Sequence, residues 1–279
     1  MRKYVPSYSG TLRSHGLTLP HCISECSGIR IFGKRIKSIA FSTDAAIIKN
    51  INADAIIAVY PFTPQASISQ AVINVADVPV FVGVGGGYTN GSRSVRLAMQ
   101  AEHQGAYGVV VNAPMPNEVI AEIKSVVDIP VIATVVSDRS DIKGRIEAGT
   151  DIFNVSGAAE TASIVRHIRE QYPHAAIIAT GGPTEESILE TIRAGANAIT
   201  ITPPTTGELF AASCTTTARR SCKSLHNIKN TLPLSAGACF CMESLSSPRA
   251  RWRRRPRPRR RSGGSRRRAS ARFRGKRDR

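Results

Sequence analysis

Cysteine is absent from the whole middle of this 279-residue sequence, because none occurs between Cys26 and Cys214. Disulfides therefore cannot hold the central part of the fold together. The sequence also lacks any apolar run of about 18 residues, the length that a membrane-spanning helix needs. Met1-Arg2-Lys3 is basic, but no apolar segment of signal-peptide length follows it. These absences predict a soluble, cytoplasmic protein without a membrane partner.

The familiar metal-binding patterns are missing as well. No His-x-His, HExxH or carboxylate cluster occurs in the sequence. The glycine-rich stretch 83–88, GVGGGY, departs from the dinucleotide-binding pattern GxGxxG, because Tyr88 takes the place of the last glycine. We therefore expect neither a metal nor an organic cofactor. The stretch itself is either a backbone nest of phosphate size or a tight turn.

Positive charge is confined to one end of the chain. Residues 1–210 carry 17 Lys and Arg against 18 Asp and Glu, whereas residues 211–279 carry 21 against 2. The second segment is rich in Arg, Ser, Pro and Gly and cannot bury a core, so we expect it to be disordered.

Three interpretations of residues 211–279 compete. The segment could be an arm that binds nucleic acid through its phosphates. It could instead hold zinc through Cys222, His226, Cys239 and Cys241, although their spacing is irregular. We favour a third interpretation, in which the abrupt change of composition marks a non-native ending that resembles GC-rich codons read out of frame. Nucleic acid is then a partner only if the segment is genuine.

Between residues 37 and 202 an apolar strand followed by an amphipathic helix recurs about every 21 residues. The predicted strands are Ser38–Phe41, Ala55–Tyr60, Val80–Val84, Gly108–Val111, Val131–Val135, Asp151–Val155, Ile177–Thr180 and Ala198–Ile201. The predicted helices are Ala45–Ile51, Gln65–Val75, Arg93–Gln104, Asn117–Val127, Asp141–Ala148, Ala159–Gln171 and Glu185–Arg193. Eight even units favour a closed (β/α)8 (TIM) barrel over a doubly wound open sheet.

The domain organisation follows from this repeat. Residues 1–34 read as an irregular segment that closes the barrel, residues 35–210 as the barrel, and residues 211–279 as the basic tail. The eighth helix is incomplete, because only Gly207 to Phe210 remain before the composition changes.

The stretch Ala175–Thr206 predicts an anion site. Gly181 and Gly182 form a turn that leads from a strand into a helix, and Thr184 suits the N-cap. Free backbone N–H groups and the helix dipole at such a point can hold phosphate. The alternative is a helix-entry turn without a ligand.

Several stretches carry a resemblance to known proteins. The Gly-Gly turn before the last predicted helix resembles the phosphate-binding barrels of the ribulose-phosphate-binding type. More closely, SHGLTLPHC, GKRIKSIAFSTDAAIIKN, ADAIIAVYPFTPQ, NVSG and ATGGPTEESILETI resemble small uncharacterised bacterial barrels loosely labelled "hydrolase". The resemblance covers about residues 10–210 and implies the barrel fold, but it implies no defined chemistry.

In such a barrel, the working residues stand at the carboxyl ends of the strands. The positions there suggest binding groups for a phosphorylated substrate: Gly85, Gly86, Asn112, Asn154, Ser156, Thr180, Gly181, Gly182, Thr202 and Thr205. No lysine or cysteine is among them, which argues against a Schiff base or a thiolate nucleophile.

Four residues are candidates for proton transfer. Asp44 and Asp138 follow strands, and each could be either a general base or a helix N-cap, the cap being the favoured role for Asp44. His15 and His21 could close over the barrel mouth or merely pack beneath it.

We therefore expect a small-molecule enzyme acting on a phosphorylated metabolite, with isomerase, lyase and hydrolase chemistry all open. The alternatives are a ligand-binding barrel without turnover and a protein that binds nucleic acid through its tail. Assembly as a homo-oligomer also stays open.

Overall fold

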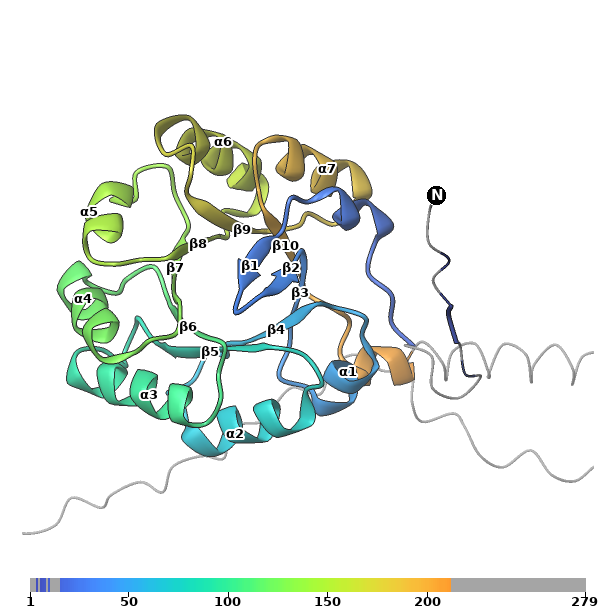
Figure 1. The fold of residues 1–279 in the computed structure, drawn as a ribbon, viewed down its shortest axis with the longest axis horizontal. Helices are drawn as coiled ribbons and strands as arrows, with labels where there is room; N and C mark the ends of the chain where they lie inside the picture. The colour runs from blue at the N-terminus through green and yellow to red at the C-terminus, as the bar shows by residue number, and fades with distance from the viewer. Residues whose placement is uncertain (1–3, 5, 9, 11–15, 212–279) are drawn as a thin grey trace, which may run out of the picture. The chain divides into compact units, whose positions relative to one another are not determined.

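A computed structural model describes residues 4, 6–8, 10 and 16–211 of the chain. Eight parallel strands close into a barrel in the order β10-β3-β4-β5-β6-β7-β8-β9, with helices around the outside (Figure 1). The strands are β3 (Ser38–Phe41), β4 (Ala55–Ala58), β5 (Val80–Gly85), β6 (Gly108–Val111), β7 (Val131–Val135), β8 (Ile152–Val155), β9 (Ala176–Thr180) and β10 (Ala198–Ile201). The predicted (β/α)8 barrel is confirmed.

The helices that alternate with these strands also match the sequence pattern. They are α1 (Ala45–Asn50), α2 (Ala66–Val75), α3 (Ser92–His103), α4 (Asn117–Val126), α5 (Ile142–Glu147), α6 (Thr161–Gln171) and α7 (Glu185–Arg193). Every predicted helix and barrel strand ends within two residues of its observed end. In the described residues, no helix has the length and apolarity to cross a membrane. The predicted tail, and with it the possible zinc ligands, lies outside the described residues from position 212 onward.

Aliphatic side chains fill both faces of the barrel wall. One buried cluster lies inside the barrel, where Ile57, Phe81 and Ile132 are almost fully buried. Two further clusters pack the outer face of the strands against the helices. Parallel strands that are buried on both faces read as continuous apolar runs, which is why the sequence pattern located them so closely.

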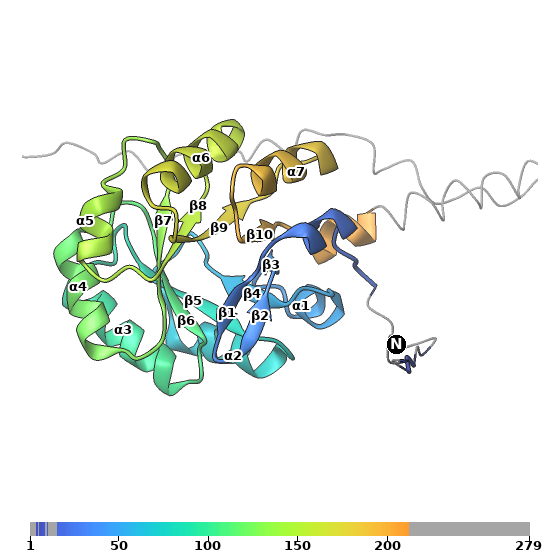
Figure 2. The ribbon, with the colours of Figure 1, turned by 45° about the horizontal axis from the view of Figure 1, so that its top comes forward.

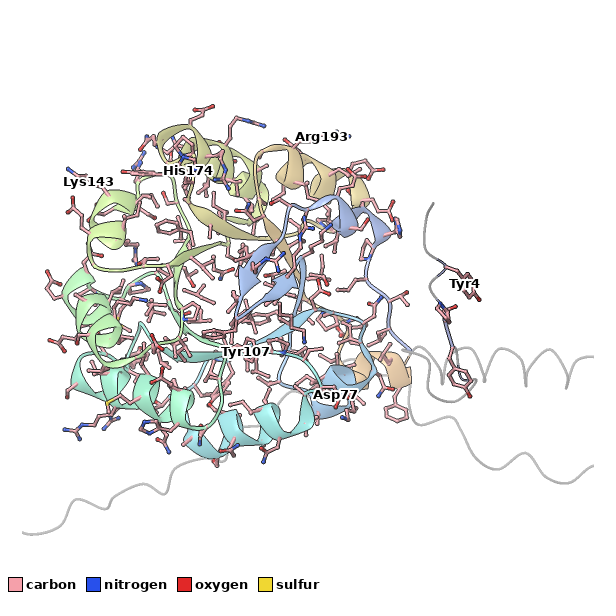
Figure 3. All side chains as sticks on the ribbon, viewed as in Figure 1. Tyr4, Asp77, Tyr107, Lys143, His174 and Arg193 are labelled. Carbon is pink, nitrogen blue, oxygen red and sulfur yellow. The ribbon has the colours of Figure 1, made fainter. Side chains whose placement is uncertain are left out.

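A short hairpin closes the amino-terminal end of the barrel. Strands β1 (Ile29–Ile31) and β2 (Lys34–Ile36) pair antiparallel across a two-residue turn. Figure 1 shows this hairpin across the middle of the ring of strands. Ile31 and Ile36 belong to the cluster inside the barrel, and the Phe32 ring meets the edge of Tyr107 at a centroid distance of 5.5 Å. Figure 3 shows Tyr107 toward the middle of the ring, with Asp77, Lys143, His174 and Arg193 on the periphery.

The prediction that residues 1–34 are irregular was wrong for this hairpin. Each strand has three residues, too few to show a clear alternation, and three of the six are charged: Arg30, Lys34 and Arg35. The turn has positive φ at Phe32 (43°) and Gly33 (80°), and Phe is not a residue that signals such a turn in a sequence.

Residues 17–27 cover the seam where the first and last barrel strands meet. The 3-10 helix η1 (His21–Glu25) lies beside α7, as Figures 1 and 2 show. Ile23 and Cys26 are buried among side chains of α7 and β10, including Ile188 and Ile199. Burial raises the pKa of the Cys26 thiol to about 11. The last described helix starts at residue 206, and the described residues end at 211.

This packing makes a stability prediction. Ile23→Ala should lower the free energy of unfolding by about 2–4 kcal/mol, because Ile23 is 2 % exposed and its removal leaves a cavity at the seam. Chemical denaturation measures the change, with Ile146→Ala as the control, since Ile146 is 39 % exposed on α5. Equal stability of the two variants would show that the amino-terminal segment does not support the seam.

Candidate functional site

An inward-facing layer of side chains lies at the carboxyl end of the strands. On each strand, the residue of this layer comes two positions after a residue of the apolar cluster inside the barrel. Side chains two positions apart on a strand point to the same face, so this layer also faces inward. The layer is apolar on one side of the barrel, with Phe41, Val59 and Gly83. It is polar on the other side, with Asn112, Thr134, Asn154, Thr180 and Thr200.

Hydrogen bonding within the polar half is incomplete. The Asn154 side-chain amide donates to the Thr134 hydroxyl at 3.4 Å, which is a long contact. Thr200 is 4 % exposed, and within the described residues its hydroxyl has no hydrogen-bond partner. A buried hydroxyl without a partner is costly, so this position suits a ligand or water that would complete its bonding.

A hollow of about 370 Å³ opens beside this layer, between the loops that follow β4 and β5. Asn112 and Gly85 line it together with two exposed aromatic side chains, Phe62 and Tyr88. A register shift in the pairing of β5 with β6, between Gly83 and Gly85, ends the strand at this point. Gly86 has a φ of 115°, and a Cβ there would lie 2.6 Å from the Asn112 nitrogen, so only glycine allows this approach.

Asp44 caps α1 and ties the last loop of the barrel to the first. Its carboxylate accepts hydrogen bonds from the backbone N–H groups of Ala46 and Ile47. It also accepts from the Thr206 hydroxyl at 2.5 Å and from the Thr206 backbone N–H at 3.2 Å. The hydroxyl of Thr206 is the main cause that lowers the pKa of Asp44, and burial acts in the opposite direction. This bonding suits a structural carboxylate and leaves it a weak base.

The loops after β9 and β10 are closed largely by their own side chains. Thr184 caps α7 through a capping box with Ser187. Glu185 and Glu186 stand in the first turn. The pKa of Glu186 is lowered mainly by a hydrogen bond from its own backbone N–H and secondarily by one from the Thr184 hydroxyl. Thr205 forms a similar reciprocal pair with Glu208 at the start of helix 206–211. These groups occupy donors that an anion would otherwise use.

The glycines of the predicted anion loop have packing roles. A Cβ at Gly182 would lie 2.1 Å from the Ser187 hydroxyl oxygen, and a Cβ at Gly181 would lie 2.7 Å from an Ile201 methyl carbon. The Gly181 backbone N–H donates to the Thr200 carbonyl. In the part of the chain that the structure describes, the Gly182 N–H donates to no protein acceptor.

The remaining predicted site residues are dispersed. Ser156 and Thr202 are exposed on the rim of the mouth. Asp138 is exposed and accepts from the Ser137 hydroxyl, while Asp141 caps α5. His21 is exposed on η1, on the outer wall, apart from the inward layer. His15 lies outside the described residues.

Sequence reasoning missed the place of Thr200, because it read the residue as part of a strand. Counting two residues along β10 from Ala198, which lies in the interior cluster, would have placed Thr200 in the polar layer. Within the described residues, no three His, Cys, Asp or Glu side chains gather as a metal site would require.

The contacts of Asp44 predict a pH-dependent stability. The pKa of Asp44 is lower in the folded state than its ordinary value of 3.8, which applies to the unfolded chain. The contact with Thr206 therefore stabilises the fold at pH values above 3.8, and this stabilisation is lost as the pH falls through the pKa of the folded state. Thr206→Val should therefore cost about 0.5–1.5 kcal/mol at neutral pH and progressively less below the unfolded value. Thermal unfolding across pH, with the exposed Thr202→Val as control, checks this. A cost that does not change with pH would contradict it.

The fold is shared with solved structures at low sequence identity. The chain is 14 % identical to a protein assigned as a phosphonomutase from Burkholderia cenocepacia J2315, with a TM-score of 0.51 over 72 % of this chain and 96 % of that one. It is 13 % identical to a 2,3-dimethylmalate lyase of the PEP mutase/isocitrate lyase superfamily, with a TM-score of 0.51 over 74 % and 85 %. It is 14 % identical to a mandelate oxidase variant, with a TM-score of 0.50 over 63 % of this chain and 69 % of that one. No family model and no curated protein matches the sequence. These likenesses establish the barrel fold.

Proposed function

We propose that this barrel is an enzyme that holds a small phosphorylated metabolite at the carboxyl end of its strands. The observation that carries the proposal is the buried Thr200 hydroxyl, which has no partner among the described residues and lies in a layer of amides and hydroxyls. This is the end of the barrel at which (β/α)8 enzymes carry their active sites.

The polar layer would bind the oxygen atoms of the ligand. Asn112 and Asn154 offer both a donor and an acceptor, and Thr134, Thr180 and Thr200 offer hydroxyls that can do either. The side formed by Phe41 and Val59 would accept the carbon skeleton. Such a neutral layer suits hydroxyl and carbonyl oxygens, and it leaves the phosphate group to a backbone site.

For the phosphate group, the sequence predicted the loops after β9 and β10. The free N–H of Gly182 and the exposed Thr202 on the rim support this placement. The carboxylates of Glu186 and Glu208 count against it, because they already stand at the helix starts where an anion would bind.

One observation favours a second candidate, a binding barrel without turnover. Within the described residues, the inward layer holds no ionisable side chain, and Asp44 is committed to hydrogen bonds with α1 and Thr206. General acid-base chemistry needs a group that can exchange a proton near neutral pH. Isomerase, lyase and hydrolase chemistry stay open in the first candidate.

The polar layer makes a binding prediction. Asn154→Leu and Thr180→Val remove donors and acceptors at nearly constant size, so each should weaken binding of the preferred sugar phosphate by roughly 10-fold. A panel of sugar phosphates, tested by thermal shift and then calorimetry on the full chain, identifies the ligand and measures its affinity. Asn74→Leu on the exposed face of α2 is the control.

If both variants bind the sugar phosphate as tightly as the unchanged protein, the ligand does not bind at the polar layer of the barrel mouth. Turnover of the ligand that binds, followed by product analysis, separates the enzyme from the binding barrel. Full affinity without any product would favour the second candidate.

A further inference from the structure

The amino end of α3 lacks the side-chain cap that α1, α5 and α7 have. Its N-cap is Gly91, which provides no side-chain cap, and no acidic residue stands in its first turn. The first N–H groups of a helix have no partner within the helix, so those of Ser92, Arg93 and Ser94 need acceptors from elsewhere. Helices α2 and α6 share the lack of a side-chain cap and of a first-turn acid, so the buried serine described next is what sets α3 apart.

Ser94 adds a buried hydroxyl to these backbone donors. Its residue is 0 % exposed, and within the described residues its hydroxyl has no hydrogen-bond partner. Side chains of a helix lean toward its amino end, so this hydroxyl faces the start of α3. A Cβ built on Gly85 would lie 2.5 Å from the Ser94 oxygen, which shows that the hydroxyl points into the glycine turn ahead of the helix.

The glycine turn keeps this place free of side chains. The Gly86 N–H donates to the Thr89 carbonyl and closes the turn, while the Gly85 carbonyl accepts from the Asn112 N–H. Gly85 and Thr89 also line the 370 Å³ hollow beside the polar layer. The start of α3 therefore adjoins the space proposed for the ligand.

Arg93 has an unfavourable position unless an anion is present. A cation in the first turn opposes the helix dipole, which favours negative charge at that end. Arg93 is exposed, and within the described residues it forms no ion pair. A bound oxyanion would turn the unfavourable charge into an attractive one.

We infer that the start of α3, with the N–H groups of residues 92–94, the Ser94 hydroxyl and the Arg93 guanidinium, binds a phosphate oxyanion. The inference rests on the proposed function for its ligand: the phosphate of the metabolite binds here, after β5, and not at the loops after β9 and β10. Free inorganic phosphate carries the same chemistry and binds at the same place.

Amide chemical shifts of the full chain, titrated with inorganic phosphate and then with ribose 5-phosphate, locate the site. The amides of residues 92–94 should shift with both probes. Ser94→Ala should weaken inorganic phosphate binding by roughly 10-fold, because it removes a hydrogen bond to a charged group. Arg93→Gln should weaken it and reduce its dependence on salt. Ser69→Ala is the control, since Ser69 is a buried serine of α2 whose hydroxyl already donates to the Gln65 carbonyl.

Glu186→Gln discriminates between the two locations. It removes a carboxylate from the start of α7, so it should strengthen phosphate binding if the anion sits there and leave it unchanged if the anion sits at α3. Stronger binding in Glu186→Gln, shifts confined to the loops after β9 and β10 or to residues after 211, or full affinity in Ser94→Ala would each overturn the inference. Absence of any shift at residues 92–94 at millimolar phosphate would overturn it as well.

The outcomes also separate this inference from the proposed function. Shifts at residues 92–94 with inorganic phosphate, while no metabolite binds the polar layer, would support the anion site and contradict the proposed function. A metabolite whose binding depends on Asn154 and Thr180, and which leaves residues 92–94 unmoved, would support the function and contradict the site.

Discussion

The pairing of β10 with β3 is the constraint on which the rest of the structure depends. Ile199 stands opposite Ser38 and Ile201 opposite Ala40, and this register turns eight strands into a closed ring without an edge. Closure fixes which side chains point inward, and it brings the loop after β10 against α1, where Asp44 meets Thr206. Residues 17–27 cover the outside of this seam.

The sequence predicted the barrel because its strands are aliphatic on both faces and recur evenly. That signal is local and strong, so the strands could be located without knowledge of any tertiary contact. The hairpin at 29–36 and the cover of the seam carry no such period. Ile23 and Cys26 are buried by elements more than 150 residues away in the sequence, at Ile188 and Ile199, and no local pattern encodes that relation.

The candidate site was predictable only in part. Strand ends identified Asn112, Asn154 and Thr180, because parallel strands bring their carboxyl ends to one face. The sequence could not show in which glycine loop the backbone N–H groups are left without a partner from the protein. Glu186 and Ser187 follow Gly182 closely, yet only the folded geometry shows that they close their own helix start. Ser94 reads as an ordinary helical serine until its hydroxyl is found buried beside Gly85.

The hydrogen bond between the Asn197 amide and the Ser27 hydroxyl spans 170 residues of sequence. Contacts of such separation raise the contact order of the fold, and chains with high contact order fold slowly because loop closure must precede the gain in energy. On a ribosome, η1 emerges early, but Ile23 and Cys26 acquire their partners Ile188 and Ile199 only after α7 and β10 have been made. Until then the side chain of Ile23 lacks these partners. The architecture therefore makes closure of the barrel seam a late step in the life of the nascent chain.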